Sequence, residues 1–471
     1  MVLQRRLFSF SFAIITLFSF FFTLGTAPKI LIGSPGVSDV APEMRTPQYW
    51  IKKIKNPGHI LLTAEAIDRM NEENLRRQDL HLFRIKDLKE DWQREEIRNL
   101  LGEDWENFDK TQELRYGKNG TSLGDPFWNE LKSKLNQDSI QKRSRMFYAL
   151  IVKRTDIRVF PTDESSIGSP RRYEFDRFQH SSISPGSPIG IYHFSKDKSW
   201  AYVQTGFIRG WVHSRDLAAA RERKEIMDYE DAKDRLMVIG NAITIFDDPS
   251  FRQSAFIAKM GDSFPLFNLP SDTPKTSPCY VVSIPSREDN GYLTLRKGYI
   301  RSDEDVHQGA LSLTQENIAL QAFKMLGHPY GWGDRDGGRD CSGFIMDLFK
   351  TFRILMPRNS KEQGRVGMDL GFVDGKTIKE KQSLLEQALP LATTLRSPGH
   401  IMLYLGKDKG RYYVIHSIWG IQRPGASGPK IEKIGKVVVS DLDLGKKGPN
   451  GSLLDRVTDI RMIGTNPEVL K

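Results

Sequence analysis

The residues with the clearest chemical potential are one cysteine and two histidines. Cys341 lies where a glycine-rich stretch, residues 328–340, meets an apolar segment. That segment carries apolar side chains at helical spacing, which predicts that Cys341 occupies the first turn of a buried helix. Backbone N–H groups and the positive end of the helix dipole stabilise a thiolate there, so we expect a lowered cysteine pKa. A lone cysteine is otherwise most often a small buried apolar side chain.

The two histidines fall in apolar runs that predict consecutive strands. His400 opens the run 400–406 and His416 lies in the run 412–417, with a short charged stretch that ends in glycine between them. This pattern predicts a β-hairpin on which the two imidazoles face each other. One imidazole can then act as general base to Cys341 while the other orients it, which is the arrangement needed for covalent catalysis.

Taken together, these motifs resemble a known enzyme family. The stretch Tyr330-Gly-Trp332-Gly precedes Asp340-Cys341-Ser342-Gly343-Phe344, and Gly399-His400 and Ile415-His416 follow. The set resembles the NlpC-type papain-like cell-wall peptidases. This resemblance implies that Cys341 is the nucleophile, His400 the base and His416 the orienting residue.

The resemblance also implies a substrate site around the cysteine. In the branch of the family with bacterial SH3 domains, the residues that flank the cysteine bind the free amino end of a wall peptide, which here implicates Asp340 and Ser342. The family's aromatic positions match Tyr330 and Trp332. From the residues alone, Asp340 equally fits a helix N-cap, and the two aromatic rings equally fit packing of the loop onto the helix. The charged residues 334–336 depart from the family pattern, which leaves subsite preference open.

The whole chain of 471 residues is too long for one core and predicts about three domains of roughly 100 to 200 residues each. The expected organisation is a mainly helical segment at 46–144, a β-barrel at 145–222, a second β-barrel at 228–305, and a catalytic domain at 312–471 with 453–463 as its last strand. Short β-like runs between turns predict the barrels, and both resemble bacterial SH3 domains. The helical segment resembles the amino-terminal stabilising segment of this branch. Two helices followed by a strand meander predict an α+β papain-like core.

The start of the chain has the pattern of an export segment. Arg5 and Arg6 precede an uncharged stretch rich in Phe, Leu and Ile. We therefore expect residues 1–27 to be a signal peptide or an uncleaved membrane anchor, followed by a linker at 28–45. In either case the body of the protein is exported to the periplasm or cell envelope. Only Cys279 and Cys341 are present, and we expect no disulfide between them because pairing would consume the nucleophile.

The charge and the histidine pattern bear on partners and cofactors. The formal net charge is +10, from 69 Lys and Arg against 59 Asp and Glu that are interspersed along the chain. Such a surface favours anionic polymers such as peptidoglycan, and we expect no nucleic-acid partner, although charge alone does not exclude one. The nine histidines show no ligand spacing with Cys, Asp or Glu, so we expect no metal and no cofactor. We expect a monomer.

The resemblance implies a cysteine endopeptidase that cleaves the bond between γ-D-glutamyl and a diamino acid in murein peptides through a thioester. A second hypothesis is a non-catalytic peptidoglycan-binding protein that keeps only the fold. A third is an amidase or acyltransferase, because the same Cys–His chemistry serves all of these reactions.

Overall fold

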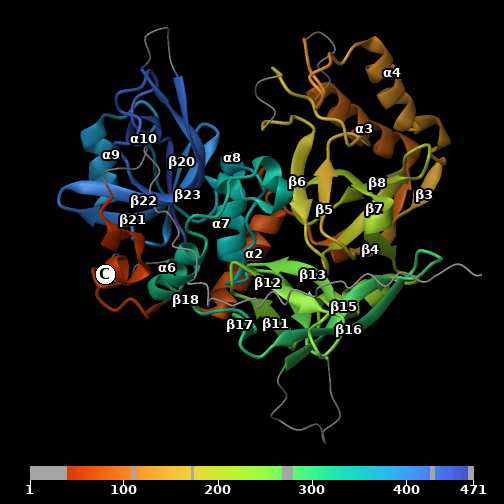
Figure 1. Ribbon diagram of the computed structural model, residues 1–471, viewed down its shortest axis with the longest axis horizontal. Coiled ribbons are helices and arrows are strands. Elements are labelled where there is room, and N and C mark those ends of the chain that lie inside the picture. The colour runs from red at the N-terminus through yellow and green to blue at the C-terminus, as the bar shows by residue number, and fades with distance from the viewer. Residues whose placement is uncertain (1–39, 109–112, 171–173, 268–278, 425–429, 465–471) are drawn as a thin grey trace, which may run out of the picture.

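The computed structural model describes residues 40–108, 113–170, 174–267, 279–424 and 430–464. The predicted signal or anchor at 1–27 and most of the predicted linker lie outside these ranges. Within them, no helix combines the length and the apolar character that crossing a membrane requires. Figure 1 shows an α+β unit formed by the C-terminal part of the chain, two β units beside it, and N-terminal helices that contact both sides.

The C-terminal unit is built on one antiparallel sheet of six strands in the order β19-β24-β20-β21-β22-β23. Its strands are β19 (Met368–Phe372), β20 (Thr393–Ser397), β21 (His400–Asp408), β22 (Arg411–Arg423), β23 (Lys430–Asp441) and β24 (Asp459–Met462). Its helices are α6 (Gln315–Lys324), α7 (Cys341–Lys350), α8 (Ser360–Gln363), α9 (Ile378–Leu385) and α10 (Leu453–Arg456). Helix α7 packs against β21 and β22, and its apolar side chains join those of the sheet in one core. The predicted α+β class is confirmed.

Two details of this sheet differ from the expectation. The predicted last strand at 453–463 is wrong at its start, because Ser452 caps the short helix α10 and only Asp459–Met462 is extended. That strand, β24, lies between β19 and β20 and not at the edge of the sheet. The edge strand β19 was not predicted, since half-exposed and exposed side chains give it no clear alternation.

The hairpin that carries the histidines is formed as predicted. Strands β21 and β22 are antiparallel, and Asp408 pairs with Arg411, so only two residues make the turn. Lys409 and Gly410 have φ values of 45° and 81°. Both residues are left-handed, which is the geometry of the turns whose twist matches that of the two strands.

The first β unit is a single sheet of seven strands in the order β10-β4-β7-β8-β9-β5-β6. Its strands are β4 (Phe147–Ile151), β5 (Thr155–Arg158), β6 (Gln179–Ile183), β7 (Pro188–Phe194), β8 (Trp200–Gln204), β9 (Arg209–His213) and β10 (Leu217–Ala219). Tyr202 and Trp211 are completely buried and Trp200 is nearly so. These aromatic side chains therefore build the interior of the unit and are not an exposed recognition surface.

The second β unit contains two sheets, β14-β11-β17 and β13-β12-β16-β15, around a shared apolar core. Its strands are β11 (Arg235–Val238), β12 (Ala242–Phe246), β13 (Ser254–Lys259), β14 (Ser263–Pro265), β15 (Cys279–Arg287), β16 (Leu293–Arg301) and β17 (Val306–Gln308). Helix α5 (Arg223–Glu230) connects the two β units. Cys279 opens β15 and forms no disulfide with Cys341.

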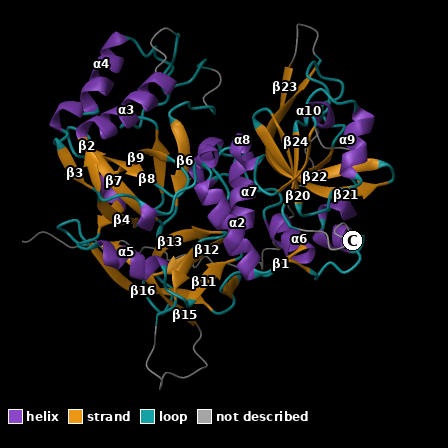
Figure 2. Ribbon diagram, turned by 180° about the vertical axis from the view of Figure 1, so that it is seen from behind, coloured by secondary structure: helices purple, strands orange, loops and turns teal. Residues whose placement is uncertain are grey.

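The N-terminal region contains short strands as well as the predicted helices, and it packs on two different cores. Its elements are η2 (Pro42–Arg45), α1 (Pro47–Ile51), β1 (Ile60–Leu62), α2 (Ala64–Arg76), η3 (Gln78–Leu80), η4 (Ile85–Asp87), β2 (Asp91–Gln93), α3 (Arg94–Phe108), α4 (Asp125–Lys134), η5 (Gln137–Ser139) and β3 (Arg143–Arg145). The part before η4 shares the core of the C-terminal unit, and β1 pairs with β18 (Leu313–Thr314). Helices α3 and α4 instead cover the first β unit (Figure 2).

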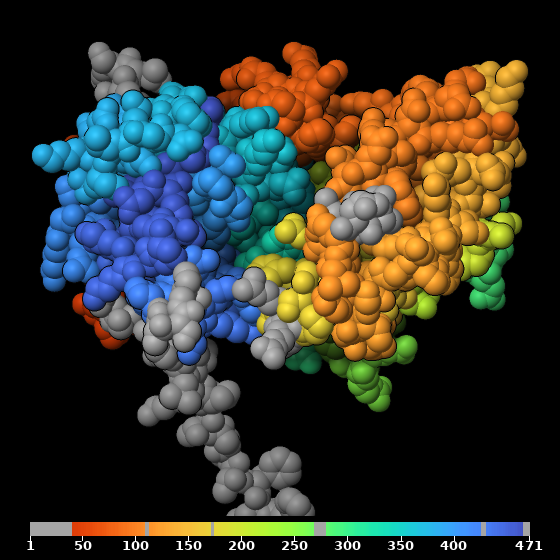
Figure 3. Space-filling model, turned by 90° about the horizontal axis from the view of Figure 1, so that it is seen from above, coloured from red at the N-terminus to blue at the C-terminus, as the bar shows by residue number. Residues whose placement is uncertain are grey.

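Residues 40–45 differ from the linker expected there. Met44 and Val40 are buried in the core of the C-terminal unit, and the indole of Trp50 donates a hydrogen bond of 2.8 Å to the carbonyl of Met44. The Trp50 ring also packs against Tyr413 of β22, with 5.3 Å between ring centroids. In the space-filling view of Figure 3, the blue surface of the C-terminal unit lies on the left and the light orange surface of later N-terminal residues lies on the right. The exact domain boundaries stay a prediction.

Candidate active site

Cys341 is the first residue of helix α7, as the sequence predicted. Asp340 is the N-cap, and its carboxylate accepts a hydrogen bond of 2.7 Å from the backbone N–H of Gly343. The Cys341 side chain is 7% exposed, and its Sγ lies 3.9 Å from the carbonyl oxygen of Gly399. The fold therefore brings the cysteine to the start of the strand that carries His400.

The two histidines face each other across the hairpin. Nε2 of His400 lies 2.7 Å from Nδ1 of His416, a hydrogen-bond distance. His416 is completely buried, and its other nitrogen, Nε2, lies 3.0 Å from Oγ of Ser440 on β23. Because Nε2 of His400 is used by His416, Nδ1 is the nitrogen that remains for Cys341. The structure thus brings together the three residues singled out in the sequence and adds Ser440, which sequence reasoning missed.

Burial sets the protonation of this group. Burial and, to a lesser extent, the nearby Asp340 carboxylate raise the pKa of the Cys341 thiol to about 12. Burial also lowers the pKa of His400 to about 4 and holds the pKa of His416 well below its ordinary value. The expected lowering of the cysteine pKa is wrong for this state, because desolvation of a nearly enclosed thiolate outweighs the helix dipole. The resting pair is a neutral thiol and a neutral imidazole.

Arg358 holds the carboxylate of Asp340 beside the cysteine. The guanidinium donates to both carboxylate oxygens, from Nη1 at 3.2 Å and from Nη2 at 2.8 Å, and its side chain is 2% exposed. Its Nη1 also donates to the hydroxyl of Ser342 at 2.8 Å. Burial alone would raise the pKa of Asp340, but the charge and hydrogen bonds of Arg358 outweigh it and keep that pKa below its usual range.

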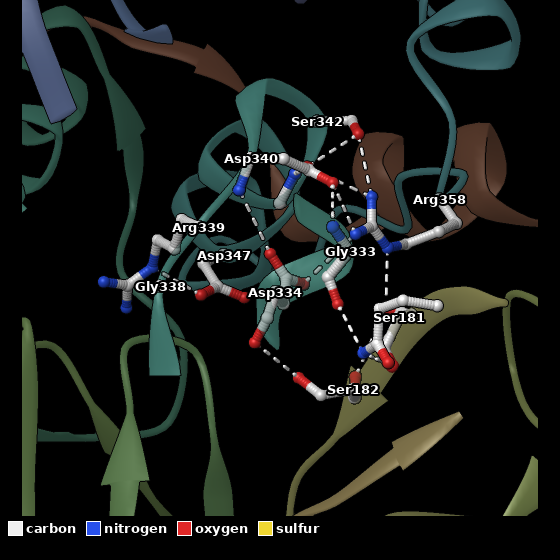
Figure 4. Close-up of polar contacts among 12 residues, drawn as sticks. Ser181, Ser182, Gly333, Asp334, Gly338, Arg339, Asp340, Ser342, Asp347 and Arg358 are labelled. Atoms are coloured by element: carbon white, nitrogen blue, oxygen red, sulfur yellow. Dashed lines mark hydrogen bonds and ion pairs between the residues drawn. The ribbon is translucent and has the colours of Figure 1, made fainter. Parts of the chain in front are cut away.

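The first β unit contributes hydrogen-bonding residues to this network. Strand β6 is one of the two edge strands of its sheet, and the hydroxyl of Ser181 on it accepts a hydrogen bond of 2.6 Å from Nε of Arg358. Gln179, on the same strand, donates to the carbonyl of Gly333 at 3.1 Å, and Ser182 donates to that of Asp334 at 3.4 Å. Figure 4 shows Ser181, Ser182 and Arg358 close to the loop that precedes Cys341. In the sequence, Arg358 is marked only as the first residue of a polar stretch, 358–363. Nothing in the sequence indicated that strand β6 contributes to the site.

Asp334 connects the same loop to helix α7. Its φ of 58° is left-handed, and burial raises the pKa of its carboxyl. The carboxyl packs directly on Gly343, where an added Cβ would lie 2.1 Å from Oδ1 of Asp334. Gly343 is therefore required by close packing at the third position of the helix.

We expect Gly343→Ala to destabilise the protein by about 1–3 kcal/mol, because the new methyl group overpacks a buried carboxyl. Urea unfolding followed by tryptophan fluorescence measures this change. Gly102→Ala is the matched control, since Gly102 lies within α3 and an added Cβ there meets nothing within 4 Å. The control gains helix propensity and should be neutral or slightly stabilising. Equal unfolding midpoints for the two variants would contradict the packing seen at Gly343.

The predicted aromatic residues lie at the junction of the C-terminal unit with the first β unit. The ring of Trp332 packs edge-on against that of Phe175, with 5.3 Å between ring centroids, and its Nε1 donates a hydrogen bond of 2.9 Å to the carbonyl of Asp176. Tyr330 is half-buried, and its ring lies 5.9 Å from that of Trp419. These contacts account for packing. A role in substrate binding for Tyr330 and Trp332 stays a prediction.

Asp340 and Ser342 both belong to the buried network beside the cysteine. The hydroxyl of Ser342 donates to Asp340 at 3.0 Å, and the backbone N–H of Gly333 donates to the other carboxylate oxygen at 3.1 Å. Binding of a substrate amino end by these two residues stays a prediction. Over the part of the chain that the structure describes, no group of three or more His, Cys, Asp or Glu residues could hold a metal ion.

Comparison with known proteins agrees with this geometry. Residues 327–422 match the model of the NlpC/P60 family, and residues 168–213 match the model of the SH3 domain of SH3b1 type. A γ-D-glutamyl-L-lysine dipeptidyl-peptidase of Bacillus subtilis (strain 168) is 31% identical over 94 residues, which are 19% of this chain and 32% of the relative. The alignment therefore spans about a third of that relative's length.

One of the matched solved structures has a similar fold over most of the chain. An NlpC/P60 endopeptidase from Photobacterium damselae subsp. piscicida has a TM-score of 0.71 at 19% identity, covering 89% of this chain and 97% of its own. An NlpC/P60 family protein from Bacillus cereus has a TM-score of 0.45 at 16% identity, covering 68% of this chain and 100% of its own. Residues 327–422 thus match the NlpC/P60 family model and residues 168–213 match the SH3b model, on a fold similar to that of a solved NlpC/P60 endopeptidase.

Proposed function

We propose that this protein is a cysteine endopeptidase of peptidoglycan that cleaves the bond between γ-D-glutamyl and a diamino acid in murein peptides. The observation that carries the proposal is Cys341 at a helix N-terminus, beside the hydrogen-bonded pair of His400 and His416. The family match supports peptide hydrolysis in the cell wall, and the Bacillus subtilis relative acts on a γ-D-glutamyl-L-lysine bond by its name.

The proposed reaction begins from the neutral pair. The sulfur of Cys341 attacks the carbonyl carbon as Nδ1 of His400 takes the thiol proton, so a free thiolate need not accumulate at its raised pKa. The developing oxyanion is stabilised by backbone N–H groups at the start of α7, including that of Cys341. His400 then gives the proton to the leaving amine, which releases the diamino acid portion. Water, activated by the same imidazole, hydrolyses the thioester.

Recognition of the peptide's amino end is a separate part of the proposal. Asp340 is placed beside Cys341, but its carboxylate already accepts hydrogen bonds from Arg358, Ser342 and two backbone N–H groups. A substrate ammonium would have to share those oxygens. Whether a free amino end is required is therefore a question that a pair of substrates can decide.

The test is mass spectrometry of the purified protein incubated with L-Ala-γ-D-Glu-diaminopimelate peptides whose amino end is free or acetylated. We expect cleavage after D-Glu, and cleavage of the free peptide alone would support recognition of the amino end. Equal cleavage of both peptides would remove that role from Asp340 and Ser342. Bound but uncleaved peptide would favour a wall-binding protein, and cleavage or acyl transfer at another bond would favour an amidase or acyltransferase.

The proposed place of action is the cell envelope. The family match supports a cell-wall substrate, and the net charge of +10 favours association with an anionic wall polymer. The segment 1–27 that predicts export lies outside the described residues.

A further inference from the structure

We propose that Ser440 is a positioning residue that selects the productive tautomer of the two histidines, an inference that rests on the proposed function. Ser440 lies on β23 and its side chain is 1% exposed. In the register of β22 and β23, Val414 pairs with Ser440 and His416 pairs with Val438. Because side chains alternate along a strand, Ser440 and His416 lie on the same face as diagonal neighbours. This places Oγ 3.0 Å from Nε2 of His416.

The two imidazoles and the hydroxyl form one chain of hydrogen bonds. A neutral imidazole has one N–H donor and one acceptor nitrogen. If Oγ of Ser440 accepts from Nε2 of His416, then Nδ1 of His416 is the acceptor for Nε2–H of His400. Nδ1 of His400 is then unprotonated and can take the proton of Cys341.

If the hydrogen bonds run in the opposite direction, His400 is an unsuitable base. If the hydroxyl of Ser440 donates to His416, then Nδ1–H of His416 donates to His400, and the hydrogen of His400 moves to Nδ1. With a hydrogen on Nδ1, His400 cannot take the proton of Cys341. Both histidines are neutral near pH 7, since burial lowers the pKa of each. The position of the hydrogen therefore decides whether His400 can act as the base at that pH.

In the productive direction the N–H of His400 donates to His416 and the N–H of His416 donates to Ser440, so each of these two N–H groups has an acceptor. Removing the hydroxyl at position 440 would leave the N–H at Nε2 of His416 facing a methyl group. The buried His416 would then favour the hydrogen on Nδ1, which is the pattern that blocks the base.

The test compares Ser440→Ala, Ser440→Cys and Ser440→Thr in the full chain, with peptide kinetics and ¹⁵N NMR of histidine-labelled protein at pH 7. We expect kcat to fall about 10-fold in the alanine variant with KM unchanged, because one buried hydrogen bond is lost. Threonine keeps the hydroxyl and should stay within about 3-fold of the wild type, while the weakly accepting thiol of cysteine should give an intermediate value.

The NMR signals give a result that altered stability alone would not produce. Assigned by their loss in His400→Gln and His416→Gln proteins, both histidines should carry the hydrogen on Nε2 in the wild type and on Nδ1 in Ser440→Ala. Thr393→Val is the control, since it removes another buried hydroxyl of this sheet, bonded to the Leu389 carbonyl at 2.8 Å. It should leave both tautomers unchanged.

Three results would overturn the inference: unchanged kcat and tautomers in the alanine variant, no recovery with threonine, or a wild type with the hydrogen on Nδ1. If the alanine variant does not fold, the cysteine and threonine variants decide by the same criteria. If the wild type cleaves no peptide, the proposed function fails. The tautomers of the wild type and its variants still test the role of Ser440 separately.

Discussion

Replacing Cys341 by alanine is expected to abolish peptide cleavage while leaving the fold intact. The loss in kcat should be at least about 10⁴-fold, because no intermediate can form without the nucleophile. The helix should keep its N-terminus, since the cap runs from the Asp340 carboxylate to the backbone N–H of Gly343 and does not involve the thiol. Mass spectrometry of the murein peptide reaction measures the remaining cleavage.

The other cysteine provides the matched control. Cys279 lies at the start of β15 in the second β unit, away from the helix that carries Cys341. Cys279→Ala should therefore retain turnover within about 2-fold, whereas Cys341→Ala should give no product above the uncatalysed rate. Cleavage by the Cys341→Ala protein at an appreciable fraction of the wild-type rate would refute the assigned nucleophile.

Replacing Arg358 by methionine is expected to destabilise the protein by about 3–5 kcal/mol, because it leaves the buried Asp340 carboxylate without its partner. Arg358 donates four hydrogen bonds, to Asp340, Ser342 and Ser181, and forms an ion pair with Asp334 at 3.5 Å. Methionine retains much of the apolar volume but supplies none of these donors. The free energy of unfolding in urea measures the difference.

Arg143→Met is the control for the loss of an ion pair as such. Arg143 pairs with Asp91 at 2.8 Å, but the two side chains are 67% and 50% exposed. An exposed pair contributes about 0–1 kcal/mol, so this variant should unfold close to the wild type. Similar losses in the two variants would show that burial of Asp340 does not set the cost.

The effect of Arg358→Met should also depend on pH. In the wild type the pKa of Asp340 is lowered, so its contribution is present above the unfolded pKa of about 3.9 and is lost as pH falls through the folded pKa. Without Arg358, burial raises that pKa, and the carboxyl then costs stability as pH rises above about 3.9. The difference between the two proteins should therefore be larger at pH 8 than at pH 5. A constant difference would indicate a loss of packing only.

The same cluster explains how the first β unit bears on the proposed chemistry. Ser181 on β6 contacts Arg358, Arg358 contacts Asp340, and Asp340 caps the helix that begins at Cys341. An edge strand of the β unit thus forms part of the support of the nucleophile. The first β unit, which includes the residues that match the SH3b model, therefore supports this site.

The amino-acid sequence by itself determined the local parts of the candidate site. Apolar spacing after Cys341 and the capping aspartate before it specify where α7 begins, because both signals act within one helical turn. The turn at Lys409 and Gly410 likewise fixes the hairpin that places His400 opposite His416, since its backbone geometry depends on a few neighbouring residues.

Only the tertiary structure decided which distant groups complete the site and how they are charged. Arg358 meets Asp340 across 18 residues and Ser181 across 177, and no local pattern encodes such pairs. The predicted start of strand β24 was wrong. The strand also lies inside the sheet and not at its edge, because strand order follows from packing and not from sequence order. The thiol pKa was expected to fall and instead rises to about 12, since desolvation sums over every element packed around Cys341, whereas the helix dipole is a property of one element.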